Sequence, residues 1–516
     1  MSSVIKHSET TVPAIEFQTS GRFKRTLPVV APIVLAIVFI LIRLFYGQHA
    51  FLYESALTML ALMSYLTAAT VLVTNFFVKE NYLSYAGLIS VALGYCFNLS
   101  GWMIRWIEAG EKEGWIGANV WRYFPLDNLY ALTLGFCAGA ALATLVIIRN
   151  PKYRVLGVFA MPIISVIMLQ AFFLGGEIRT LPPILNSYWL PMHVTTATFG
   201  YGAALVSFGI AVAYLIKDGV RSEAFAIVAA LFGLLVLSVA SGGSVLFHAE
   251  YGPSLTLENQ GLPIRSILPV VGSVMLVTFF VLLAALVLFI AAWKGNKLNL
   301  NIWAWRLFRL SVVTIGLGIG LMFYQISQTS NPGALATSRD YGEFGAFLAK
   351  NMQTNVTVAQ QGSFAQNWLQ QNGSRLALGY NSNPVEFGAL VTLFVSLLMT
   401  ALIALKREAV TATLPSLNAL DALLYRTVGV VVPLLTLLLI TGAVWANESW
   451  GRYWGWDPKE VGSLVTWMAF AGYLHLRLVA GWKGRRSAYV VLLGFVLVIF
   501  TWLGVSYLLP GLHSYA

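Results

Sequence analysis

Long apolar runs separated by short polar segments extend over almost the whole chain. A run of about 20 residues with few charges is long enough for an α-helix to cross a bilayer. We predict about thirteen such helices, at 28–46, 52–78, 84–104, 129–148, 155–174, 193–216, 223–247, 266–293, 306–326, 385–405, 423–445, 463–481 and 487–509. The pattern therefore predicts an all-α fold, a polytopic transmembrane helical bundle.

The composition supports the same class. Hydrophobic residues make up 58% of the 516 residues and charged residues only 10%, with a mean hydropathy of +0.75. In soluble domains about a quarter of the residues are charged. The first apolar run has the length of a membrane span and lacks a small-residue cleavage site, so we expect no cleavable signal peptide.

The net charge of +11 is interpreted as membrane topology. Lys and Arg collect in the cytoplasmic loops of membrane proteins, and a set of basic residues that flank the predicted spans falls on one side. They are Arg22, Lys24, Arg25, Arg149, Lys152, Arg154, Lys294, Lys297, Lys406, Arg407, Lys483, Arg485 and Arg486. We therefore expect a cytoplasmic N-terminus, a C-terminus on the outer (periplasmic or extracytoplasmic) face and no nucleic-acid partner.

The longest polar segment between predicted spans, 327–384, falls on the outer side. Its many Asn, Gln, Ser and Gly residues favour a small lid or a flexible loop. The two cysteines, Cys96 and Cys137, are far apart in apolar runs and form no CxxC motif. Thiol redox chemistry within this chain is therefore not expected.

Tryptophans cluster at 445–460, in the sequence WANESWGRYWGWDPKE between two apolar runs. Trp is enriched at membrane interfaces, where it forms an aromatic belt. Large aromatic faces also stack on flat ligands. A belt requires no fixed spacing, whereas this segment has the regular pattern W-G-x-x-W-x-W-D. The pattern therefore favours a site for a flat ligand.

Two of the six histidines are predicted to lie at the level of this cluster. His193 begins one predicted span and His513 follows the last one, both on the outer face. Two neutral imidazoles on opposite sides of a plane form the usual axial pair of a low-spin haem iron. Taken singly, each could equally be an interfacial histidine bonded to water or backbone. Together with the Trp cluster, they favour a haem site.

A third histidine, His475, is predicted to lie well inside the span that follows the Trp cluster. Ionisable side chains at membrane depth are costly and commonly functional. His475 is therefore a candidate ligand of a second, transmembrane haem, with the second ligand supplied by a partner subunit. The alternative is a hydrogen bond to a neighbouring helix. None of the remaining histidines is suitably placed to be the second ligand of that haem. They are His7, His49 and His248.

Several motifs resemble one known family. At the C-terminal end they are WGRYWGWDPKE, TWMAFAGYLHLR, GWKGRR and GLHSYA, and earlier in the chain LSGWMIRWIEAG, PLDNLYALTLGF and WLPMHVTTATFGYGAALVSFGIAVAYL. Together they resemble the CcsA (ResC) proteins of the haem-handling superfamily that is defined by a WWD domain and includes CcmF and CcmC. The C-terminal motif is the most specific of them.

The resemblance covers about half of the chain and implies a domain organisation. A cytoplasmic polar tail at 1–27 and an extra N-terminal helix at 28–52 precede CcsA-like helices at 53–217. Residues 218–417 are an insertion of about four helices, since family members have a short connection there, and 418–516 form the CcsA-like WWD module. An even number of inserted spans keeps the Trp cluster on the outer face.

The resemblance also implies a function, c-type cytochrome biogenesis, at a bacterial inner membrane or a thylakoid-type membrane. Haem b is then both bound ligand and substrate, delivered or attached at the outer face to the CxxCH motif of an apocytochrome c. The implied partners are a CcsB (ResB) membrane subunit and, indirectly, a thioredoxin-like protein that keeps the cysteines reduced. The chain would be a subunit of a cytochrome c haem lyase.

Site residues carry over from the family by position. The WWD signature corresponds to Trp450, Gly451, Trp454, Trp456 and Asp457, with Trp445 and Tyr453 beside it. The external axial ligands correspond to His193 and His513, and the histidine of the transmembrane haem site to His475.

The implied reaction requires no nucleophile from this chain. Each CxxCH cysteine thiol adds across a haem vinyl group, and holding the reactants in register lowers the barrier. Trp450, Trp454 and Trp456 are expected to hold the porphyrin. Arg452 is the natural partner of a propionate. Asp457 would repel a propionate, so we favour a capping role for it before Pro458, and the contacts of Glu460 stay open.

Two further functions stay open. One is a haem exporter or chaperone like CcmC, which hands haem over without forming a covalent bond. The other is a haem-b electron-transfer membrane subunit. Such subunits place pairs of histidines within the helical bundle, whereas His193 and His513 are predicted at the outer face. The positions of these two histidines disfavour the electron-transfer hypothesis.

Overall fold

The structure is a computed structural model of the whole chain. It describes residues 19–48, 51–115, 120–126, 128–174, 176–178, 183–185, 187–252, 254–257, 262–265, 267–295, 297–328, 338–372, 378–379, 384–505, 509 and 511. Most of these residues are in helices, and the three strands are very short. The prediction of an all-α polytopic bundle is confirmed.

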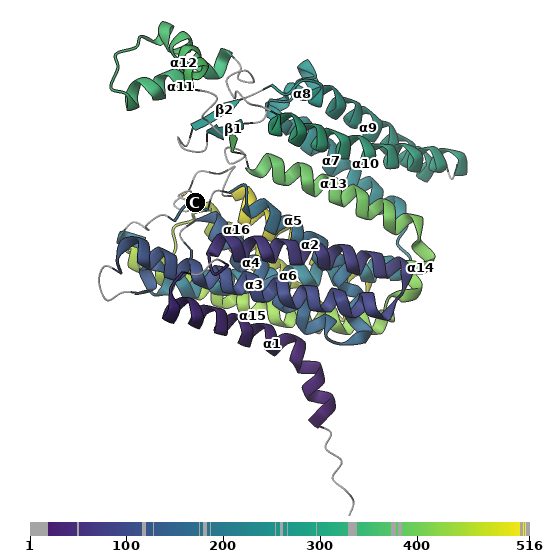
Figure 1. Cartoon of the computed structure of the whole chain (residues 1–516). Coiled ribbons are helices and arrows are strands. Elements are labelled where there is room, and N and C mark those ends of the chain that lie inside the picture. The colour runs from purple at the N-terminus through teal and green to yellow at the C-terminus, as the bar shows by residue number, and fades with distance from the viewer. Residues whose placement is uncertain are drawn as a thin grey trace, which may run out of the picture.

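The first of two helical bundles contains helices from the N-terminal and C-terminal parts of the sequence (Figure 1). Its core contains buried residues from α2 to α6 and from α15 to α17. The bounds are α1 Thr19–Tyr46, α2 Glu54–Val78, α3 Asn81–Glu113, α4 Leu129–Ile148, α5 Gly157–Ala171, α6 Trp189–Lys217, α15 Leu417–Trp450, α16 Pro458–Leu478 and α17 Arg485–Ile499. The helix α6 packs closely on both α4 and α15.

The second bundle comprises helices from the middle of the chain and has its own buried core. These helices are α7 Ser222–Val239, α9 Val271–Gly295, α10 Leu298–Ser327 and α13 Pro384–Leu405, with the short helices α8 Ser244–His248 and α14 Arg407–Thr413 beside them. The helix α13 lies against α5 of the first bundle. Phe387 stacks there on Phe173 with ring centroids 5.4 Å apart.

Twelve helices of the described chain are long and apolar enough to cross a membrane. The thirteenth predicted span corresponds to α16, which is less apolar because its 21 residues include Lys459, Glu460, His475 and Arg477. It packs between α15 and α17. The helices often extend beyond the predicted spans. For example, α3 continues to Glu113, where Gly114 ends it in the left-handed conformation.

The polar segment 327–384, expected to be a small lid or a flexible loop, contains regular structure. It contains the helices α11 (Ser338–Asn351) and α12 (Val358–Asn372), which pack together through Phe344, Leu348, Ala365 and Leu369. Apolar residues four apart lie on one face of each helix, so the pair buries both faces. Beside them is a sheet in the order β2-β1-β3, of strands β1 Ser254–Leu257, β2 Leu262–Arg265 and β3 Leu378–Gly379.

Ion pairs connect the first bundle at the end opposite the Trp-rich loop. Arg477 of α16 donates two hydrogen bonds to Asp421 of α15, at 2.8 and 2.6 Å. Arg485 of α17 lies 2.6 Å from Asp218, which follows α6. These contacts hold together the ends of α6, α15, α16 and α17 that lie opposite the Trp-rich loop.

The helices α4 and α6 approach each other so closely that glycine is required. A Cβ atom on Gly202 would lie 2.3 Å from the backbone nitrogen of Ala140. We expect Gly202→Ala to lower the free energy of unfolding by about 2 kcal/mol, the usual cost of overpacking. Thermal unfolding of the purified protein in detergent measures this. The matched control is Gly472→Ala in α16, where no atom lies within 4 Å of the added Cβ; equal melting temperatures would contradict the close approach.

Candidate functional site

A cavity lies at the Trp-loop end of the first bundle, between α4, α6, α15, α16 and the turn after α17. Its volume is about 1000 Å³ with the space at its open mouth included. Leu132, Phe136, Leu190, Val194, Leu438 and Leu439 are among its apolar lining residues. The cavity also has a smaller polar part, described below.

His193 lines the cavity from the first turn of α6. Its Nδ1 atom is 2.9 Å from the carbonyl oxygen of Leu438. A carbonyl oxygen only accepts hydrogen bonds, so this contact requires a proton on Nδ1, and in the neutral imidazole Nε2 then keeps its lone pair. A histidine that binds a metal commonly donates its other ring N–H in this way. The contact thus fixes the tautomer that can bind iron through Nε2.

Trp445 and Gly442 of α15 set the position of this imidazole. The Trp445 side chain is only 1% exposed, and its ring is nearly parallel to that of His193, with centroids 5.9 Å apart and an interplanar angle of 17°. A Cβ atom on Gly442 would lie 2.6 Å from His193 Cε1. Gly442 therefore leaves the space that the imidazole occupies.

The Trp-rich loop is a short link whose shape is fixed at both ends. The helix α15 ends at Trp450, followed by Gly451 in the left-handed conformation. The helix α16 begins with a capping box of Asp457 and Glu460, with Pro458 at its first position. Asp457 therefore has the capping role that we favoured from the sequence. The aspartate satisfies backbone N–H groups that would otherwise lack partners.

Glu460 also stabilises the turn before the helix. Its Oε2 atom accepts hydrogen bonds from the backbone nitrogens of Gly455, at 2.8 Å, and Asp457, at 3.2 Å. Trp456 lies between these two residues with φ +59°. Bulky residues seldom adopt this left-handed conformation, so the two hydrogen bonds hold a strained residue in place.

The aromatic side chains of the loop differ in their surroundings. Tyr453 and Trp454 line the cavity. Trp450 packs instead against Trp445, with centroids 5.0 Å apart. Trp456 is 73% exposed and meets the ring of Trp454 edge-on. Of the three tryptophans expected to hold a porphyrin, only Trp454 contributes to the cavity wall in this structure.

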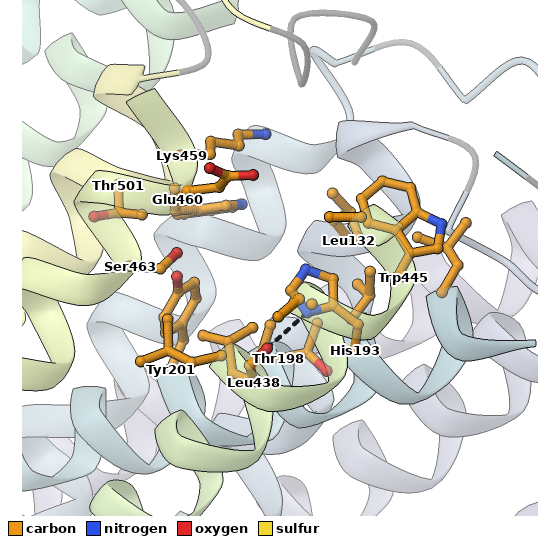
Figure 2. A pocket seen from close by; sticks show the side chains of 18 of the residues that line it. Leu132, His193, Thr198, Tyr201, Leu438, Trp445, Lys459, Glu460, Ser463 and Thr501 are labelled. Atoms are coloured by element: carbon orange, nitrogen blue, oxygen red, sulfur yellow. Dashed lines mark hydrogen bonds between the residues drawn. The ribbon is translucent and has the colours of Figure 1, made fainter. Parts of the chain in front are cut away.

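The polar part of the cavity comes mainly from α16. Figure 2 shows Lys459, Glu460 and Ser463 on one side of the cavity and His193 with Trp445 on the other. Lys459 lies before the span predicted at 463–481, in the first turn of the helix. Burial lowers the pKa of its ammonium group to about 8, because desolvation disfavours the charged form, and nearby Asp457 opposes the shift.

A turn of π-helix, Phe500–Gly504, ends α17 beside this polar part. Thr501 and Trp502 of this turn line the cavity. The hydroxyl of Thr501 is 3.1 Å from that of Thr466 in α16, and the ring of Trp502 meets Phe136 edge-on. Turns of this kind occur frequently at functional sites.

Comparison with known proteins connects this architecture to one family. The sequence profile described as "Cytochrome C assembly protein" matches residues 272–513. A protein of Trichormus variabilis named "Cytochrome c biogenesis protein CcsA" is 27% identical over 415 residues, 80% of this chain and 82% of the relative. A protein of the same name from Guillardia theta is 58% identical over 99 residues, 19% of this chain and 33% of the relative.

Over about four fifths of its length the chain is similar to the CcsA proteins of cytochrome c biogenesis. It is an integral membrane protein, and the name that these relatives share places them in cytochrome c biogenesis. A third relative of the same name, from Picosynechococcus sp., is 28% identical over 415 residues, again 80% of this chain and 82% of the relative. Because the alignments cover nearly the same share of both proteins, these two CcsA relatives are about as long as this chain.

The family profile includes the helices α15, α16 and α17, but it begins after α6 and so excludes His193. His513 lies outside the described residues. Gly511, two residues earlier, is described, and a Cβ atom there would lie 2.6 Å from Oδ1 of Asp457. Gly511 therefore lies against the cap of α16.

His475 is less deep in its helix than the sequence suggested. The helix α16 begins at Pro458 and ends at Leu478, so His475 lies in its last turn, and its side chain is exposed in this chain. The prediction of a position well inside the helix is wrong, because the helix starts and ends earlier than the predicted span 463–481. His475 does not line the cavity described above.

Sequence reasoning missed several lining residues, although a signal for some of them was present. Ala197 and Tyr201 follow His193 at intervals of four residues, and Ser463 follows Lys459 at the same interval. Side chains four apart share one face of a helix. Leu132 and Phe136 of α4 are also four apart, but neither follows a candidate site residue, and nothing in the sequence pairs α4 with α6 at this level.

The capping role of Asp457 gives a testable prediction. Asn caps helices about as well as Asp, whereas Ala costs about 1 kcal/mol. We expect Asp457→Asn to keep most cytochrome c maturation and Asp457→Ala to lose stability and activity together. Measuring matured cytochrome and the melting temperature of each variant tests this. Loss of activity in Asp457→Asn at an unchanged melting temperature would instead assign a function to the negative charge.

Proposed function

We propose that the cavity is a haem site, from which this CcsA-like protein delivers haem to an apocytochrome c for covalent attachment. The observation that carries the proposal is His193. Its Nδ1 donates to the carbonyl of Leu438, so Nε2 has the lone pair that an iron ligand needs. The imidazole stacks on buried Trp445 in a mainly apolar cavity that suits a flat macrocycle.

His513 is proposed as the second iron ligand. The proximity of Gly511 to Asp457 brings the chain near the mouth of the cavity two residues before this histidine. Lys459 and Glu460, which follow the Asp457 cap after Pro458, line the cavity. A ligand pair from α6 and the C-terminal segment would hold iron from two sides, as bis-histidine haem sites do.

In this proposal the chain acts by positioning. Bound haem supplies two vinyl groups, and each CxxCH thiol adds across one of them, forming an S–C bond and a C–H bond without net oxidation. The proposed tasks of the protein residues are to hold the iron at His193, to support the macrocycle at Trp454 and Tyr453, and to keep water from its apolar face. Such orientation lowers a barrier by several kcal/mol.

The proposed side of the membrane is the outer one. The basic connections between helices lie at the end of the first bundle opposite the Trp-rich loop, with Arg485 after the 479–484 turn as an example. Positive residues mark the cytoplasmic side, which supports an outward-facing cavity in a bacterial inner membrane or a thylakoid-type membrane. A CcsB-like membrane subunit is the proposed partner.

His475 is proposed as a ligand of a second haem, whose other ligand comes from that partner subunit. It lies at the opposite end of α16 from the cavity and has an exposed side chain. A ligand at this end would serve haem on the cytoplasmic side of the membrane. Haem content of the His475→Ala protein, measured with and without the partner, tests this role separately from the cavity.

Reconstitution tests the proposed function. The chain is expressed with a CcsB-like partner and a CxxCH apocytochrome in a host that lacks its own maturation genes. Covalent haem is then scored by peroxidase staining of a denaturing gel. We expect staining with the wild-type cytochrome and none with a cytochrome whose two cysteines are serine. Haem in the purified protein without any stained cytochrome would indicate a chaperone, and absence of both would contradict a haem site.

A further inference from the structure

Lys459 gives the cavity a positive charge that the haem-site proposal does not yet use. Among the described residues, Lys459 and Glu460 are the only Lys, Arg, Asp or Glu side chains in the cavity lining. They are neighbours in the first turn of α16. Figure 2 shows both on the opposite side of the cavity from His193 and Trp445. The cavity therefore has an apolar wall with an imidazole and a polar wall with an ammonium group.

The nearby carboxylates already have partners in the backbone. Glu460 accepts hydrogen bonds from the nitrogens of Gly455 and Asp457, and Asp457 accepts one from the nitrogen of Lys459 at 3.1 Å. In the part of the chain that the structure describes, no hydrogen bond or ion pair is found for the Lys459 ammonium group. Both acids hold the loop, and the ammonium group is available to a ligand.

The Lys459 side chain is half-buried, and an anionic ligand group would compensate the desolvation of its ammonium group. Arg452 does not line the cavity; its guanidinium group lies about 3.0 Å from the place of a Cβ atom on Gly455. The sequence alone does not choose the propionate partner, although Arg452 is chemically suited to that role, and the cavity lining favours Lys459. The ammonium group is a compact charge with three donors, which suits one carboxylate oxygen.

We propose that Lys459 binds a carboxylate substituent of the ligand, so that the site selects flat macrocycles that carry free carboxylates. The inference rests on the proposed haem site and adds the feature by which it distinguishes one porphyrin from another. The apolar wall beside His193 receives the macrocycle, and Lys459 orients it by its acidic edge. A porphyrin whose carboxylates are esterified keeps the macrocycle and loses this contact.

Two porphyrins, one with free and one with esterified carboxylates, distinguish the contribution of the macrocycle from that of the carboxylates. Iron protoporphyrin IX and its dimethyl ester are titrated into the purified full-length protein in lipid nanodiscs, with binding followed by absorbance. We expect the wild-type protein to bind the diacid about tenfold more tightly than the ester, as charge-assisted hydrogen bonds allow. In Lys459→Gln the two affinities should differ by less than about threefold, and Lys459→Arg should restore most of the preference.

The ratio of the two affinities within one preparation is independent of the fraction of folded protein. Lys350→Gln in α11, outside the cavity lining, is the matched control and should keep the wild-type ratio. An unchanged ratio in Lys459→Gln would overturn the inference while leaving the haem site intact. Failure of the wild-type protein to bind either porphyrin would overturn the haem site itself.

Discussion

Replacing His193 by Ala should lower haem binding and cytochrome c maturation by more than about a hundredfold. Loss of second-shell contacts to a metal ligand alone costs 10- to 100-fold, and this change removes the proposed ligand itself. The Leu438 carbonyl and the Trp445 ring, which orient the imidazole, remain in place. Peroxidase staining of the reconstituted cytochrome and the absorbance of the purified protein measure the two effects.

Imidazole gives this experiment a chemical control. The cavity left by His193→Ala has the size of the missing ring, so added imidazole should restore part of the haem absorbance. His248→Ala is the matched substitution, since His248 ends the short helix α8 away from the cavity and is exposed. Staining that survives His193→Ala without imidazole would show that His193 is not the ligand.

Gly442→Ala should disturb the same imidazole without changing its chemistry. The new Cβ atom would lie 2.6 Å from His193 Cε1 and 2.7 Å from its Nδ1, so the ring must move and weaken its bond to Leu438. We expect haem affinity to fall about tenfold or more, with an altered absorbance spectrum, because overpacking of this kind costs 1–3 kcal/mol. Absorbance titration with haem measures the change.

Gly429→Ala provides the comparison on the same helix. Gly429 lies in α15 with no atom within 4 Å of an added Cβ, and Ala favours a helix more than Gly does. This variant should bind haem normally and be slightly more stable. If both glycine variants bound haem as the wild type does, the position of the imidazole against α15 would be wrong.

The membrane helices were predictable because a bilayer imposes one length and one polarity on every span. The ends were less predictable, since helical hydrogen bonding continues into polar residues, as α3 does to Glu113. For the segment 327–384 a small lid was one of two alternatives, but the helices α11 and α12 themselves were not predicted. Their small apolar core at Phe344 and Leu369 is hidden in a segment rich in Asn and Gln.

Part of the candidate site could likewise be predicted from the sequence, and part could not. The capping role of Asp457 followed from local pattern, because Asp-Pro with Glu three residues after the Asp is a helix start. The stacking of His193 on Trp445 could not be predicted, since the two residues meet only through the packing of α6 on α15. For the same reason sequence alone did not show that Trp450 packs behind Trp445 and that Trp456 points outward.

An experimental structure of the haem-loaded protein in nanodiscs tests the central claim most directly. The haem should occupy the cavity between α6, α15 and α16, with His193 Nε2 bound to iron and Nδ1 still donating to the Leu438 carbonyl. The carboxylates should face Lys459. Haem bound only elsewhere, such as beside His475 or within the second bundle, with His193 unbound, would contradict the account.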